Sequence, residues 1–128
     1  MKQDNVVRTK TYAFAVWMVN LYKHLRSTER EFVLSQQILR SGTSIGANVR
    51  EALRAESSAD FVHKLNIVLK EAAETQYWLE LLKDADFITK QAFNSLNADC
   101  EEVIKLLVSI ISLTRKKNSI QVKHSELA

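Results

Sequence analysis

Apolar side chains recur along most of the chain at steps of three and four residues, the spacing that puts them on one face of an α-helix. Four ladders of this kind occur, at about residues 6–25, 38–52, 57–82 and 89–115. The connections between them are short. The pattern therefore predicts an all-α fold, an up-down-up-down four-helix bundle in which consecutive helices are antiparallel.

Polar residues indicate where the later helices begin and end. Ser57 or Ser58 can accept hydrogen bonds from the free amides at the start of the third helix, where Asp60 favours the positive helix end. Thr89 is suited to cap the last helix, which we expect to end near Arg115. Residues 115–128 would then form a loosely held tail of a single domain that spans residues 1–128.

The second ladder passes through SGTSIGAN, residues 41–48, which contains both glycines of a 128-residue chain that has no proline. Each glycine costs roughly 1 kcal/mol of helix propensity relative to alanine. Close approach of a neighbouring helix over this strip of small residues would offset that cost. The predicted helix-packing motif consists of Gly42, Ser44, Ile45, Gly46, Asn48 and Glu51.

Two other interpretations of the same stretch are open. In one, a helix ends at Arg40 and Ser41 with Gly42 as a left-handed cap, and the next begins at Thr43 or Ser44. The ladder keeps its phase across the stretch, which favours the continuous helix. In the other, the glycines cradle a phosphate, but a Walker loop needs four residues between its glycines and here only three separate them.

Two of the predicted helices are more apolar than a monomeric bundle requires. Residues 103–113, VIKLLVSIISL, keep only a narrow polar stripe, and residues 12–22, YAFAVWMVNLY, are interrupted only by Asn20. A surface helix of a monomer has a wider polar face, and large exposed apolar patches mark interfaces. We therefore expect a homo-oligomer whose subunit interface includes Trp17, Val108 and Ile111.

The segments SGTSIGANVREA (41–52) and DFVHKLNIVLKEAAETQYWLELL (60–82) resemble the bacterial 23S ribosomal-RNA intervening-sequence proteins. The resemblance covers the middle third of the chain closely and the outer helices only by pattern. It implies a left-handed four-helix bundle assembled as a ring of five identical subunits, a homopentamer without established enzymatic activity. A relative of that family, the accessory protein of diversity-generating retroelements, forms a similar ring that binds a reverse transcriptase and nucleic acid.

The same resemblance singles out family-type positions in this chain. They are Ser41, Ser44, Asn48, Glu51, Leu65, Glu74 and Trp78. Asn48 and Glu51 lie one turn apart on the second helix, as Glu71 and Glu74 do on the third. We expect these side chains to pair with helix termini or arginines, in structural roles. No family pattern matches the C-terminal tail.

Residues for catalysis, cofactor binding or metal binding do not form a usable pattern. Di-iron bundles need two Glu-x-x-His units and two further glutamates, whereas only DFVH, residues 60–63, approximates one unit. Cys100 continues an apolar ladder and is expected in the core. We therefore expect no enzyme, cofactor or metal. The single cysteine suggests a cytoplasmic protein, and no apolar run approaches the ~20 residues that cross a membrane.

Charge is distributed unevenly although the formal net charge is only +3. Residues 1–50 and 103–128 have a basic excess, and residues 51–102 have an acidic one. In the predicted bundle, the start of the first helix, the second connection and the exit of the last helix meet at one end. The basic residues expected to contact RNA or DNA phosphates there are Arg8, Lys10, Arg50, Arg54, Arg115, Lys116, Lys117 and Lys123. The alternative hypothesis is a structural or protein-binding oligomer with no role in nucleic-acid binding.

Overall fold

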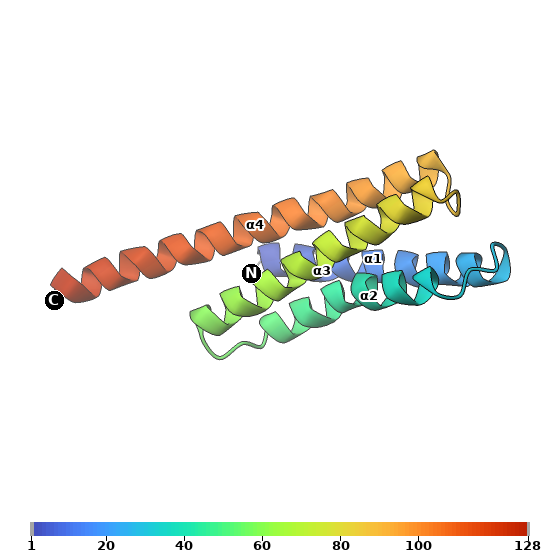
Figure 1. Cartoon of the computed structure of the whole chain (residues 1–128). Helices are drawn as coiled ribbons and strands as arrows, with labels where there is room; N and C mark the ends of the chain where they lie inside the picture. Colours follow the sequence, from blue (N-terminus) through green and yellow to red (C-terminus); the bar gives the residue numbers. More distant parts are fainter. Residues whose placement is uncertain (1, 128) are drawn as a thin grey trace.

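The computed structural model describes residues 2–127, which form four helices (Figure 1). These are α1 (Lys2–Ser27), α2 (Leu34–Ala52), α3 (Ser58–Asp84) and α4 (Lys90–Leu127). Consecutive helices run in opposite directions, and each helix packs against two neighbours, with α4 closing the bundle against α1. The predicted up-down-up-down four-helix bundle is therefore confirmed.

Both predicted helix caps are present, and α3 ends in a defined turn. The Ser57 hydroxyl accepts a hydrogen bond from the Asp60 amide at 3.1 Å, and the Thr89 hydroxyl accepts one from the Ala92 amide at 3.0 Å. Asp86, with a φ of 65°, follows α3, and the Phe87 amide donates to a carbonyl in its last turn at 2.9 Å. This hydrogen bond satisfies a free helix carbonyl and turns the chain toward α4.

The core is formed by apolar side chains from all four helices. Members with no exposed surface include Leu25, Ile45, Leu79 and Leu107. Cys100 lies among them, as predicted. Burial, with smaller effects of the Glu101 and Asp99 carboxylates, raises the pKa of the Cys100 thiol to about 12. The thiol is therefore protonated at neutral pH, unlike a reactive cysteine.

The last helix is longer than predicted. Its expected end near Arg115 is wrong, because α4 continues to Leu127; residue 128 of the expected tail lies outside the described residues. After Asn118 the side chains are exposed, so the extension has no buried face that an apolar ladder could reveal. The helix continues because no glycine or proline ends it. Figure 1 shows these last turns projecting past the other three helices.

The second helix is continuous through both glycines, as the sequence predicts, and the left-handed cap is excluded because neither glycine has a positive φ. A Cβ atom built on Gly42 would lie 2.3 Å from the Cγ of Met18, and one built on Gly46 would lie 3.2 Å from the carbonyl oxygen of Thr11. Both neighbours belong to α1. The glycines therefore allow α1 and α2 to approach more closely than side chains would permit.

We predict that Gly42→Ala destabilises the protein although alanine is the better helix former. The added methyl group would overlap the buried Met18 side chain, and overpacking typically costs ~1–3 kcal/mol. The 2.3 Å contact puts the expected cost in the upper part of this range, above the roughly 1 kcal/mol gained in helix propensity. Urea unfolding measures the difference in free energy. Gly46→Ala is the matched control and should lose less stability, because the Cβ atom built on Gly46 lies no closer than 3.2 Å to its nearest neighbour, the carbonyl oxygen of Thr11.

A double-mutant cycle with Met18→Ala identifies the cause of the loss. When the Met18 side chain is shortened, Gly42→Ala should cost much less, because the contacts with Met18 Cγ and Sδ are gone and only the 3.1 Å contact with the Cβ atom of residue 18 remains. A Gly42→Ala protein as stable as wild type, or an equal loss in both backgrounds, would contradict the close-packing explanation.

Candidate functional site

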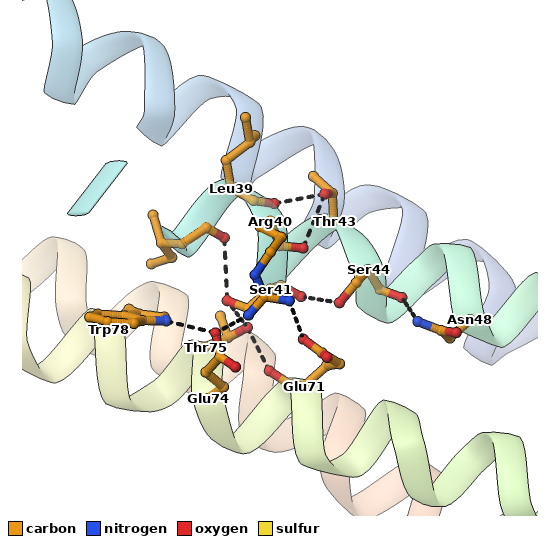
Figure 2. A network of polar contacts seen from close by, with 11 residues as sticks. Leu39, Arg40, Ser41, Thr43, Ser44, Asn48, Glu71, Glu74, Thr75 and Trp78 are labelled. Carbon is orange, nitrogen blue, oxygen red and sulfur yellow. Dashed lines mark hydrogen bonds and ion pairs between the residues drawn. The ribbon is translucent and has the colours of Figure 1, made fainter. Parts of the chain in front are cut away.

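A polar network joins α2 and α3 in the middle of the bundle (Figure 2). The hydroxyl oxygens of Ser41 and Thr75, both fully buried, are 2.9 Å apart and share a hydrogen bond. The carbonyl oxygen of Glu71, at 2.8 Å, is a second acceptor for the single proton of the Thr75 hydroxyl. Because each hydroxyl has a partner inside the core, the pair stabilises one register of α2 against α3.

The network continues to the surface through an arginine and two carboxylates. Arg40 of α2 donates to Glu71 of α3 at 3.2 Å and forms an ion pair with Glu74. The Trp78 indole also donates to Glu74, at 2.9 Å. This hydrogen bond and the Arg40 guanidinium hold the pKa of the Glu74 carboxyl below its ordinary value. The predicted pairing of the α3 glutamates with an arginine is thus confirmed.

The remaining residues of the predicted packing motif have different environments. Ser44 and Asn48 form hydrogen bonds within α2, to the carbonyl oxygens of Ser41 at 2.8 Å and of Ser44 at 2.9 Å. The side chain of Glu51 is 65% exposed and lies 3.8 Å from the Lys64 ammonium. Its assignment to the packing motif is therefore wrong, because it lies on the solvent side of the helix.

Large apolar side chains remain exposed on α1 and α4. Trp17 is 55% exposed and Val108 is 51% exposed, so both are accessible to a second subunit. Ile111 is only 5% exposed and belongs to the core of its own chain. Its predicted position at a subunit interface is wrong, because residues 103–113 are so uniformly apolar that the sequence does not separate the inward from the outward face.

A groove lies between α1 and α4, beside the connections at residues 28–33 and 85–89; we call it the α1–α4 groove. It has a volume of ≈ 730 Å³. Its apolar lining includes Trp17, Leu21, Phe87, Ile88 and Leu96, and its acidic lining residues are Glu29, Asp86 and Asp99. Of the four neighbouring helix pairs, α1 and α4 make the least contact. Sequence reasoning missed the groove because it depends on how far apart these two helices lie.

The basic residues predicted to form one face differ in their contacts. Lys10 forms an ion pair with Glu102, and the Arg50 guanidinium lies 5.3 Å from the centre of the Tyr12 ring. Arg115, Lys116 and Lys117 are consecutive and exposed on α4, and we call them the basic cluster.

Within residues 2–127 no side-chain partner is found for the basic cluster, nor for Arg8, Arg54 or Lys123. The part of the predicted nucleic-acid surface that remains available is therefore concentrated on α4.

The described residues were also compared with the requirements of a metal site and of a membrane-spanning helix. Within residues 2–127, no three His, Cys, Asp or Glu side chains are grouped so that they could hold a metal ion. None of the helices in the same range is both long and apolar enough to cross a membrane.

Comparison with known proteins places these features in a family context. A family model described as 23S rRNA-intervening sequence protein matches residues 3–109. The chain is also similar to a crystal structure, at 1.70 Å resolution, of a protein with unknown function from the S23 ribosomal protein family of Bacteroides thetaiotaomicron. The two are 60% identical with a TM-score of 0.85, and the match covers 86% of this chain and 98% of that chain. No curated protein matches.

We predict that Glu74 makes the stability of the fold sensitive to acid. Because the folded pKa of Glu74 is lowered, its contribution is complete above the ordinary pKa of 4.5 and is lost as pH falls through the lower folded value. Thermal unfolding of Glu74→Gln should therefore show a smaller fall in Tm on acidification from neutral pH than wild type. Glu80→Gln, at an exposed site on the same helix, is the control. Equal falls in the two variants would contradict this role.

Proposed function

The chain belongs to the 23S rRNA-intervening sequence protein family, and from this membership and its exposed surfaces we propose that it is a non-enzymatic, self-assembling four-helix bundle. The related crystal structure is described as a protein with unknown function, so the proposal depends on the surfaces of this chain. The proposed assembly is a closed homo-oligomer. Its number of subunits, five, is the number that the family resemblance implies.

The observation that best supports self-assembly is the set of large apolar side chains left exposed on α1. They are Val6, Tyr12, Val16, Trp17 and Val19, which are between 37% and 57% exposed. Helical spacing puts Tyr12, Val16 and Val19 on one flank of α1 and Val6 and Trp17 on the other. Exposed apolar surface marks interaction sites, and aromatic residues are enriched at interfaces. A stable interface buries about 800 Å² per partner, which is a small part of this chain's 8048 Å² of accessible surface.

We predict that Val108→Glu dissociates the oligomer without unfolding the chain. The half-exposed side chain leaves a new carboxylate solvated in a single subunit, whereas an interface would bury it unpaired at a cost of several kcal/mol. Ile111→Glu should instead unfold the chain, because Ile111 is in the core. Light scattering gives the mass and circular dichroism the helix content.

Gln91→Glu, which adds the same charge at an exposed site on α4, is the control and should keep the wild-type mass. A wild-type protein that is monomeric at micromolar concentration would reject the proposal. A dimer or tetramer would reject the stoichiometry taken from the family.

A second proposed function is sequence-independent binding of RNA or DNA. The specific observation in its favour is the basic cluster, whose three exposed cations follow one another without a partner in the described structure. In a ring, each subunit would repeat this cluster and build a dense positive surface from a chain of modest net charge. Phosphate contacts of this kind need no base-specific residues.

We predict that changing Arg115, Lys116 and Lys117 together to glutamate abolishes this binding, and light scattering records the mass of the same variant. Wild-type affinity for duplex should fall with salt at a log–log slope of about −0.9 per phosphate neutralised. Fluorescence anisotropy with labelled RNA and DNA measures both effects. The charge-matched control changes the exposed Lys23, Lys70 and Lys90 to glutamate and should still bind. If wild type does not bind at low salt, or the basic-cluster variant binds equally well, the oligomer has no such role.

A further inference from the structure

The projecting part of α4 has an apolar stripe that its own bundle does not cover. Leu113, Ile120 and Leu127 are 43%, 58% and 86% exposed. Successive members are seven residues apart, and residues at this spacing share one helix face with a drift of only ~20° per step. We call these three residues the α4 stripe. It lies beyond residues 3–109, the part of the chain that matches the family.

Basic residues border the α4 stripe on both sides. Helical spacing places Lys116 and Lys123 along one side of it and Lys117 and His124 along the other. Between residues 113 and 125 the chain contains no acidic residue. The extension is therefore a narrow apolar ridge between positive edges, and it would be stabilised by an apolar groove with a negative border.

The α1–α4 groove has this complementary chemistry. Its apolar lining includes Trp17, Phe87 and Ile88, and it has the carboxylates of Asp86 and Asp99. Glu29 is a third carboxylate, and among the lining residues of the described chain there is no lysine or arginine. The groove and the ridge are thus matched in polarity and opposite in charge.

The length of the α1–α4 groove also matches the spacing of the α4 stripe. The residues that α1 contributes to the groove include Trp17 and His24, which are seven positions apart and span ~10 Å of helix. Leu113 and Ile120 are separated by the same distance on α4. Two members of the α4 stripe can therefore contact the groove along its length.

We propose that the α4 stripe of one copy docks into the α1–α4 groove of a second copy. The groove cannot accept the stripe of its own chain. Residues 92–99 of α4 form one side of the groove, and Leu113 lies ~20 Å further along the same uninterrupted helix. The occupant must therefore come from another molecule. This inference rests on the self-association proposed above and identifies a pair of surfaces for it.

Disulfide cross-linking between two differently tagged versions of the full chain tests the contact. Both versions have Cys100→Ala, which removes the only native thiol. One version carries Ser95→Cys in the groove, and the other carries Ile120→Cys in the α4 stripe. We expect a mixed, disulfide-linked dimer on mild oxidation. The matched control replaces Ser95→Cys by Ala47→Cys, an exposed site on α2, and should give little product.

Charge exchange provides a second readout. Lys116→Glu with Lys117→Glu in the stripe version should reduce cross-linking, because these side chains would then face the Asp86 and Asp99 carboxylates. Asp86→Lys with Asp99→Lys in the groove version should restore it. Loss without restoration would contradict the proposed pairing of charges.

The mass of the unoxidised mixture distinguishes this inference from the proposed function. If the protein is oligomeric and cross-linking does not exceed the control, the docking is wrong and self-association stands. If only Ile120→Cys chains link to one another, the stripes pack together and the docking is also wrong. A mixture that contains only the tagged monomers under the same conditions would overturn both.

Discussion

Gly42 and Gly46 bring α2 into close contact with α1, and this contact positions the other helices of the bundle. Without side chains at these positions, Met18 and the backbone near Thr11 lie directly against α2. On its other side, α2 is held to α3 by the buried hydrogen bond between Ser41 and Thr75. The shortest helix of the bundle thus sets the positions of both neighbours.

The exposed apolar surface lies beside the least extensive helix contact of the bundle. The contacts of α1 and α3 with α2 are the most extensive, and the contact that closes the bundle, between α1 and α4, is the least extensive. Trp17 stays exposed beside it, and the α1–α4 groove opens there. The groove and the exposed Trp17 side chain therefore lie where the bundle is least tightly closed. They are the features from which the proposals of self-association and docking arise.

The sequence predicted those parts of the structure that have a periodic or local chemical signal. Apolar steps of three and four identify the helices, including the unbroken α2. The chemistry of Thr89 identifies it as a cap, and that of Ser57 and Ser58 narrows the other cap to these two residues, of which the structure has Ser57. The end of α4 could not be predicted, because its exposed last turns have no buried face. Val108 and Ile111 could not be told apart within one apolar run, since only the orientation of the helix against its neighbours makes one exposed and the other buried.

The proposed role of this bundle depends on its association with copies of itself through the apolar surface that it leaves exposed. Native mass spectrometry of the full chain, sprayed from micromolar solution at near-physiological salt, tests it most directly. If the chain self-associates, the spectrum contains a discrete species whose mass is a whole multiple of 14.7 kDa, with five copies expected from the family resemblance. A spectrum that contains only the 14.7 kDa chain would contradict it.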